Sequence, residues 1–303
     1  MDLNFSIGNG ADVVVNYILD NFTPALDMIA ATIGFVTGNI QSLLVSIPPL
    51  AGIAILGLLS LWRVGWKFAL FTVVSVWLIS HMGLWVGTME TLSLVLAATF
   101  IAVVIGIPLG IAMARNETVA SIVRPVLDLM QTMPAFVYLI PAAMFFGLGA
   151  VPGTIATVIF AMPPVVRLTN LGIRQVHAEF VEAGLAFGCT SSQLLFKVQL
   201  PNAMPSIMAG VNQTIMLSLS MVVIASMIGA GGLGNTVLTG IQRLDVGTGF
   251  EGGLAVVILA VVLDRLTQSF GTERSGFLSF FASRKASKET ETENPPALKG
   301  AEA

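Results

Sequence analysis

The sequence has very little charge. Only 10% of its 303 residues are Asp, Glu, Lys or Arg, whereas soluble domains carry about 25%. Hydrophobic residues make up 55% of the chain and gather in long runs that contain few ions. This composition excludes an ordinary soluble protein and predicts an all-α polytopic membrane protein. We expect membrane lipid among its partners, and no nucleic acid.

Residues that serve catalysis and metal binding are also scarce. The single cysteine, Cys189, excludes an internal disulfide framework and is expected to be a small filler. The two histidines, His81 and His177, are predicted on opposite sides of the membrane and so cannot share a metal ion. The chain has no Walker A sequence, and hence no nucleotide site of its own is expected. We therefore predict a chain without enzyme activity, metal or cofactor.

Lysine and arginine are absent from residues 1–48. Apolar residues recur there in steps of three or four, from Ile18 to Ile47, and the opposite face carries polar or small residues such as Asn16 and Asp27. The alternation predicts an amphipathic helix that lies along the membrane interface. The alternative is a spanning helix whose small residues face neighbouring helices. The first residues, Met-Asp-Leu-Asn, lack the basic start of a cleavable signal peptide.

Seven further stretches are apolar and long enough, or nearly so, to cross the hydrocarbon core of a membrane. Basic residues mark alternate turns between them, which places those turns and the C-terminus in the cytoplasm and the N-terminus outside. Only Arg243 is assigned to the outside. The predicted spans are 49–62, 66–85, 88–114, 126–148, 151–173, 204–228 and 250–270.

Prolines fall inside these central spans. In lipid, a helix break survives only where neighbours or a wet cavity satisfy the freed backbone groups, so the prolines favour a moving, cavity-lining core over a merely kinked bundle. They are Pro108, Pro134, Pro141, Pro163, Pro164 and Pro205. The glycine run Ile228–Gly234 follows no strand, so it is predicted to be a close-packed turn or gate and not a phosphate loop.

The stretch from Glu179 to Pro201 is the sizeable polar interruption in the second half of the apolar region. It predicts a short helix, a glycine break at Gly188 and a second short helix capped by Ser191 or Ser192. Pro201 marks the start of the next apolar block. An ordinary amphipathic loop between two membrane helices is the plain alternative.

The spacing of this stretch resembles the cytoplasmic coupling loop of ABC importer permeases, which reads E-A-A, three residues, G, nine residues, I-x-L-P. The matching positions are Glu182, Ala183, Gly184, Gly188, Val198, Leu200 and Pro201. Gly184 and Val198 depart from the pattern, each by a small change. The runs Gln131–Gly153, Met162–Val176 and Ile228–Gly234 are similar to permeases of glycine betaine, proline betaine and choline importers.

This resemblance implies the type I importer fold. Two permease copies would form the path, two cytoplasmic ATPases would bind ATP-Mg and drive transport, and an extracytoplasmic binding protein would deliver a quaternary ammonium osmolyte across the bacterial inner membrane. The ATPase-coupling residues would be Glu182, Ala183, Gly184, Gly188, Leu200 and Pro201. Aromatic rings suit a quaternary ammonium group, and the candidates for the translocation path are Phe136, Tyr138, Phe145 and Phe146.

The chain then divides into an N-terminal region (1–48), two peripheral helices (49–85), a permease domain (86–272) with its coupling loop (176–201), and a cytoplasmic tail (273–303) whose end we expect to be disordered. The competing function is a secondary transporter driven by an ion gradient, which needs ionisable residues at the membrane midplane. The candidates are expected near span ends, where snorkelling or pairing explains them. They are Asp128, Arg167, Asp264 and Arg265.

Overall fold

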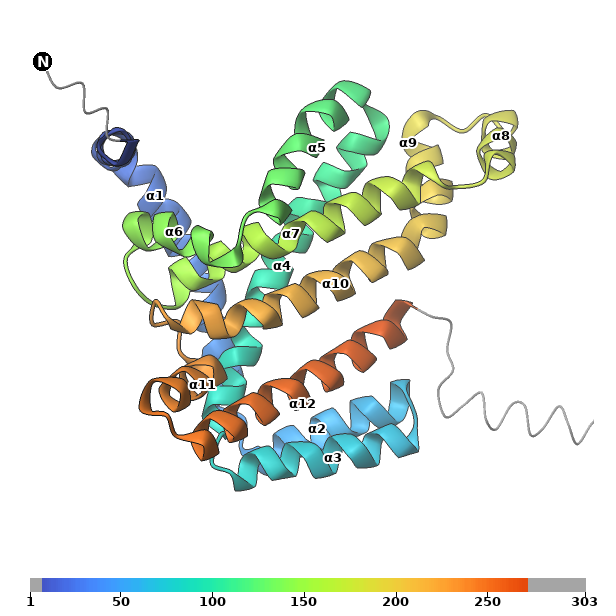
Figure 1. The fold of residues 1–303 in the computed structure, drawn as a ribbon. Coiled ribbons are helices and arrows are strands. Elements are labelled where there is room, and N and C mark those ends of the chain that lie inside the picture. Colours follow the sequence, from blue (N-terminus) through green and yellow to red (C-terminus); the bar gives the residue numbers. More distant parts are fainter. Residues whose placement is uncertain (1–6, 272–303) are drawn as a thin grey trace, which may run out of the picture.

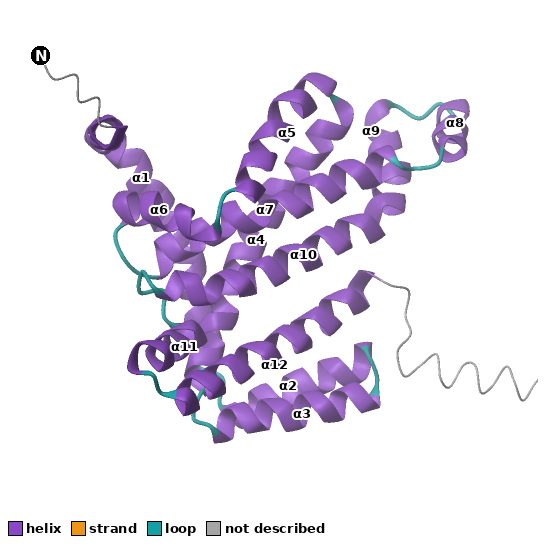
Figure 2. Cartoon of the chain, in the orientation of Figure 1, coloured by secondary structure: helices purple, strands orange, loops and turns teal. Residues whose placement is uncertain are grey.

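The computed structural model describes residues 7–271, and every regular element in this range is helical (Figures 1 and 2). The helices are α1 (Ile7–Val45), α2 (Pro49–Arg63), α3 (Trp66–His81), α4 (Trp85–Arg115), α5 (Glu117–Thr132), η1 (Ala135–Tyr138), α6 (Leu139–Phe146), α7 (Ala150–Arg174), α8 (Ala178–Ala186), α9 (Ser191–Leu194), η2 (Leu195–Gln199), α10 (Leu200–Ser226), α11 (Gly232–Arg243) and α12 (Val246–Gly271).

The centre of the bundle is α7, which packs against α4 on one side and α10 on the other. Glycines allow this close approach. A Cβ at Gly110 of α4 would lie 2.7 Å from the carbonyl oxygen of Val166, and one at Gly210 of α10 would lie 3.0 Å from the Cα of Val165. Membrane helices commonly associate through such small residues, because burying apolar side chains gains little against lipid. The sequence therefore fixes a tight three-helix core.

The helix lengths agree with the predicted fold class. Five helices within the described residues are long and apolar enough to span a membrane. They run over Val15–Val45, Trp85–Arg115, Ala150–Arg174, Ser191–Ser226 and Val246–Phe270. Two shorter apolar helices, α2 and α3, form a hairpin beside α12, joined by a 3.0 Å hydrogen bond between the hydroxyls of Ser60 and Thr72.

The predicted span at 126–148 is not one straight helix. The segments Glu117–Thr132 and Ala135–Phe146 meet at an angle of 109°. Pro134 explains the bend, because its ring disfavours helical backbone in the residue before it. Met133 accordingly adopts extended backbone, with φ −73° and ψ 137°.

The other prolines of the central spans do not break their helices. Pro108, Pro163, Pro164 and Pro205 all lie inside continuous helices, and Pro141 lies in the first turn of α6. A helix can carry a proline in a membrane when neighbouring groups satisfy the freed carbonyl. The prediction of several breaks along the core is wrong, since among these prolines the single sharp bend is at Pro134.

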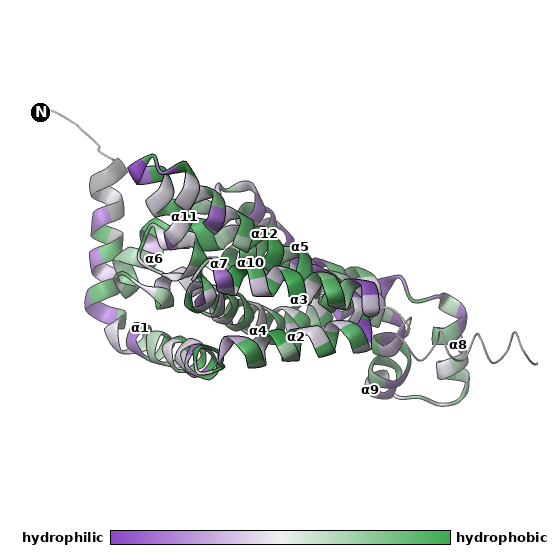
Figure 3. Cartoon of the chain, turned by 90° about the horizontal axis from the view of Figure 1, so that it is seen from below, coloured by the Kyte–Doolittle hydropathy of each residue, from purple (hydrophilic) through white to green (hydrophobic). Residues whose placement is uncertain are grey.

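Helix α1 runs crosswise to α7, α10 and α12, at the end of the bundle opposite α8 (Figure 1). It contacts α4, α6 and α7, and most of its surface is exposed. Figure 3 shows the same arrangement from below, with mainly hydrophobic helices between α1 at one end and α8 at the other. The expected tail at 273–303 lies outside the described residues, so the division of the chain into regions stays a prediction.

Candidate coupling site

The stretch between α7 and α10 projects beyond the bundle as a separate small lobe made of α8 and α9 (Figures 1 and 3). Helix α7 ends at Arg174, α8 occupies Ala178–Ala186, and the chain returns through α9 and η2 into α10. The predicted order of helix, glycine break and helix is confirmed.

Gly188 ends α8 in a left-handed conformation, with φ +77°. The N–H of Gly188 donates to the carbonyl of Leu185 at 2.9 Å, and that of Cys189 donates to the carbonyl of Gly184 at 3.0 Å. These two bonds form a Schellman motif, which satisfies carbonyls that the helix end leaves free. The glycine is needed because a Cβ is unfavourable at this φ.

Thr190 caps the second helix, so the predicted cap at Ser191 or Ser192 is wrong by one or two positions. The backbone N–H of Gln193 donates to the Thr190 hydroxyl at 3.4 Å, and the N–H of Thr190 donates to the Gln193 side chain at 2.9 Å. This is a capping box. The signal was present in the sequence as Thr-x-x-Gln.

Pro201 does not start a new helix. The chain runs without interruption from Ser191 to Ser226, with one wider π-helical turn at Leu195–Gln199. There the N–H of Leu200 bonds the carbonyl of Leu195, five residues back. Pro201 has no N–H for the carbonyl of Lys197 and crowds it, and the wider turn ahead of the proline relieves that conflict. This wider turn was not predicted from the sequence.

Gly184 lets α8 pack closely on the returning helix. A Cβ at Gly184 would lie 2.7 Å from Cδ1 of Leu194 and 3.5 Å from Cγ2 of Val198. The two departures from the family pattern, Gly184 and Val198, therefore meet each other in space. Glu182 and Ala183 are exposed on the other side of α8. Within the described part of the chain, Glu182 has no hydrogen bond or ion pair.

The lobe also exposes large apolar side chains. Phe187 is 89% exposed, and Phe180, Leu185 and Phe196 are each at least half exposed. We call these four residues the apolar lobe face. Because the lobe stands clear of the bundle, these side chains do not pack into the fold of this chain. An exposed apolar patch of this kind typically marks a protein interface.

Ion pairs anchor the base of the lobe. Arg174, the last residue of α7, binds Glu117 at 2.7 Å and also donates to the carbonyl of Met113 at 2.6 Å. Arg124 reaches the same carboxylate at 3.4 Å. These contacts join the end of α7 to the turn between α4 and α5.

The ionisable residues expected near span ends have different partners. Arg167 of α7 binds Asp128 of α5 at 2.5 Å, which confirms pairing there. Asp264 makes no ion pair within the described residues and is instead bonded to the amides of Asn212 and Gln268.

The four aromatic candidates for the path are not brought together in one wall. Tyr138 is buried against Phe160, and its hydroxyl donates to the carbonyl of Met130 at 2.9 Å. Phe136 is half exposed. Phe145 and Phe146 of α6 are partly buried and meet edge to face, with ring centroids 6.5 Å apart. Tyr138 is thus engaged in packing within this chain.

Residues 106–272 match the family described as "Binding-protein-dependent transport system inner membrane component". The chain belongs to this family.

Relatives extend the match beyond that range. The glycine betaine/proline betaine transport system permease protein ProW of Escherichia coli is 50% identical over 86% of this chain and 73% of its own length. The glycine betaine/carnitine transport permease protein GbuB of Listeria monocytogenes is 54% identical over 83% of this chain and 91% of its own length. The glycine betaine transport system permease protein OpuAB of Bacillus subtilis is 48% identical over 87% of this chain and 95% of its own length.

The architecture agrees with a solved importer. The chain resembles a permease chain of the inward-facing MetNI methionine ABC transporter, with a TM-score of 0.56 over 65% of this chain and 97% of that one. At 21% identity this likeness shows the fold alone. The predicted type I ABC importer permease, with its multi-pass placement in the inner membrane, is confirmed.

Proposed function

We propose that this permease forms the translocation path of an ATP-driven importer for a quaternary ammonium osmolyte, such as glycine betaine, proline betaine or choline. The names of its relatives support this substrate class, since glycine betaine recurs in those of three at 48–54% identity. Among the four aromatic candidates for the path, Phe136 is the ring best exposed to a cationic head group, because its side chain is half exposed.

The proposal includes a symmetric assembly. Two copies of the permease enclose the path, two separate ATPase chains bind ATP-Mg, and a binding protein delivers the substrate at the other face. The observation that carries the proposal is the α8–α9 lobe with its exposed apolar face. Beside that face lies Glu182, which is exposed and has no partner among the described residues. A groove on an ATPase would bury the apolar side chains and give Glu182 a partner.

The lobe would transmit motion as a rigid lever. Its two helices are packed through Gly184 and capped at the break, and at its base the end of α7 is hydrogen-bonded to α4 and α5. When the ATPases close, the lobes of the two copies approach, and the helices attached to them open the path toward the binding protein.

We propose that the lobe lies on the cytoplasmic side of the membrane. The turns that share its end of the bundle carry basic residues, as cytoplasmic turns do. They include Arg63, Lys67, Arg115 and Arg174. Helix α1 lies at the opposite end, where it would rest on the outer surface of the membrane, although its length would also permit a span.

Transport by the whole complex tests the proposal. Permease, ATPase and binding protein are reconstituted in vesicles whose ion gradients are collapsed, and uptake of labelled glycine betaine is followed with and without ATP on the ATPase side. We expect accumulation that requires ATP and the binding protein. Uptake that follows a proton or sodium gradient and ignores ATP would instead favour the secondary transporter.

A pair of single cysteines tests the orientation. In a Cys189→Ser background, Val246→Cys at the start of α12 should react with an impermeant thiol reagent added to intact spheroplasts. Ser192→Cys in the lobe should react only after the membrane is broken. The reverse pattern would invert the topology, and Asn9→Cys then reports in the same way on the side occupied by α1.

A further inference from the structure

The carboxylate of Asp264 lies between α10 and α12, and its hydrogen bonds within the described residues come from two side-chain amides. Asn212 Nδ2 donates to Asp264 Oδ1 at 3.0 Å, and Gln268 Nε2 donates to the same oxygen at 2.7 Å. The hydroxyl of Thr267 lies 2.5 Å from Asn212 Oδ1. Asp264 is seven residues before the end of α12, which puts it about 10 Å along the helix from that end at 1.5 Å per residue.

No cationic side chain within residues 7–271 forms an ion pair with Asp264. The ion pairs within the described residues join Glu117 and Asp128 to arginines, and none includes Asp264. Both of its hydrogen bonds go to Oδ1, so the second oxygen receives no donor from the described residues. An ionisable side chain inside a membrane span is costly and usually serves a substrate or ion pathway.

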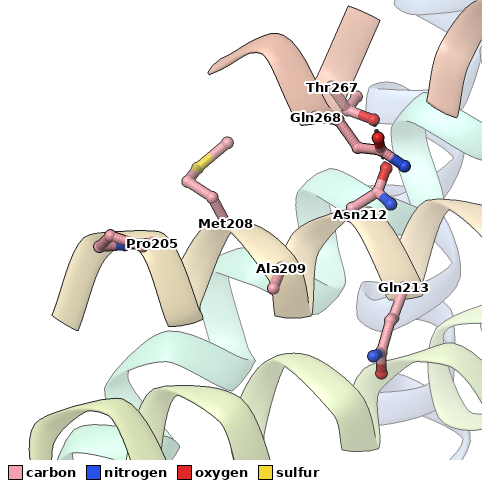
Figure 4. Close-up of a pocket in the computed structure, with 7 residues that line it drawn as sticks. All are labelled: Pro205, Met208, Ala209, Asn212, Gln213, Thr267 and Gln268. Carbon is pink, nitrogen blue, oxygen red and sulfur yellow. Dashed lines mark hydrogen bonds between the residues drawn. The ribbon is translucent and has the colours of Figure 1, made fainter. Parts of the chain in front are cut away.

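The amides that hold Asp264 also line a cleft of about 410 Å³ (Figure 4). One wall is a stripe of α10, and the other is the last turns of α12. The lining residues are Pro205, Met208, Ala209, Asn212, Gln213, Thr267 and Gln268. A stripe with neighbouring carboxamides is a poor surface for lipid tails, since polar groups in lipid need partners. The cleft is therefore suited to a polar occupant.

We propose that this cleft is a binding site along the translocation path and that it binds the trimethylammonium group of the substrate. The proposal rests on the proposed function, because it names a binding place for that substrate class. A trimethylammonium group has no N–H to donate and carries a diffuse positive charge. A suitable site supplies negative potential and oxygen atoms, and Asp264 supplies that potential from directly behind Asn212 and Gln268.

The other end of a betaine needs a hydrogen-bond donor. Gln213 lines the same cleft, its side chain is exposed, and within the described residues it makes no hydrogen bond. Its amide N–H can donate to a carboxylate. The cleft thus offers negative potential from Asp264 and a separate donor, which matches a small zwitterion.

Thiol chemistry tests the potential without relying on transport. In a Cys189→Ser background, Ala209→Cys places a thiol in the cleft. Two methanethiosulfonates of the same shape are compared, one ending in trimethylammonium and the other in the neutral tert-butyl group. Purified complex is held in nanodiscs of phosphatidylethanolamine and phosphatidylglycerol, which carry no trimethylammonium head group. The measured quantity is the ratio of the cationic to the neutral reaction rate.

We expect Asp264→Asn to lower this ratio about fivefold, because one negative charge is lost while the oxygen that accepts from Asn212 remains. Asp264→Glu should keep the ratio high. Glu251→Gln, the same chemical change in an exposed residue nearer the start of α12, should leave it unchanged. An unchanged ratio in Asp264→Asn, or an equal slowing of both reagents, would overturn the proposal.

Protection identifies the occupant. Glycine betaine should slow the labelling of Ala209→Cys in these nanodiscs. If labelling slows only when phosphatidylcholine is added to the discs, the cleft binds a lipid head group and is not a substrate-binding site of the path. If the wild-type complex fails to import glycine betaine while the rate ratio still depends on Asp264, the proposed function has failed and the cation-selective cleft stands.

Discussion

Two glycine-containing turns lie at opposite ends of this permease, and they use glycine for different reasons. In the α8–α9 lobe, a Cβ added to Gly188 would meet nothing within 4 Å, so only its φ of +77° requires glycine. At the other end, in the first turn of α11, a Cβ on Gly234 would lie 2.5 Å from the carbonyl oxygen of Val222. One turn leaves room for a partner, whereas the other is filled by its own chain.

The turn at Ile228–Gly234 is also bonded to its neighbours. Glu90 of α4 accepts from the N–H of Gly232 at 2.9 Å, and Thr91 accepts from the N–H of Leu233 at 2.8 Å. The N–H of Gly149 donates to the carbonyl of Ile228 at 2.8 Å. The predicted close-packed turn is confirmed, and its role as a gate stays a prediction. Bonds to α4 and to the α6–α7 loop make it a fixed point against which the lobe can move.

The largest effect is expected from Gly234→Ala. The new methyl group would press on the backbone of Val222 and Val223, which cannot rotate away, and such overpacking costs about 1–3 kcal/mol. We expect a lower melting temperature in detergent and less permease in the membrane. Gly253→Ala in α12 is the matched control, since its Cβ would meet nothing within 4 Å. Equal stability of the two variants would remove the contrast between the turns.

Gly188→Val should affect coupling more than folding. A side chain at this φ costs on the order of 1 kcal/mol, which distorts the end of α8 while leaving the membrane helices intact. We expect a normal amount of permease in the membrane, but less co-purified ATPase and less substrate-stimulated ATP hydrolysis. Gly188→Asn should behave almost like the wild type, because asparagine tolerates this conformation. A loss with asparagine equal to that with valine would point to steric exclusion by the partner.

Glu182→Lys tests whether the exposed carboxylate has a partner outside this chain. Reversing one interfacial charge should weaken ATPase binding and make it depend differently on salt, without changing the stability of the permease alone. Glu179→Lys, an exposed neighbour in the first turn of α8, is the control. Co-purification of ATPase that falls equally in both variants would indicate a general effect of charge and not a specific contact at Glu182.

The smallest effect is expected from Glu90→Gln. The glutamine oxygen can still accept from Gly232, so only the attraction of a negative charge to the start of α11 is lost, about 0.3–1 kcal/mol. We expect a small decrease in melting temperature and unchanged binding of the ATPase. If ATPase binding changes while stability does not, the two ends of the permease are coupled more directly than their separate packing suggests.

The sequence by itself determined the features that depend on local chemistry and on composition. Apolar runs with few charges required membrane helices, and Gly188 favoured a left-handed helix end because glycine takes a positive φ at no steric cost. The pattern around Glu182 was sufficient to predict the helix, glycine break and helix of the lobe and to indicate the family. These properties are local, so they needed no knowledge of neighbours.

Only the tertiary structure decided how residues that look equivalent in the sequence, such as the prolines and the aspartates of the spans, differ in the fold. Of the prolines in the central spans, Pro134 bends its helix sharply and Pro108 does not, because the packing around each proline determines whether the helix continues. Asp128 and Asp264 looked alike in the sequence, yet Asp128 meets an arginine and Asp264 meets amides beside a cleft. The arginine that meets Asp128 and the asparagine that meets Asp264 come from other helices, and helix packing brings them together.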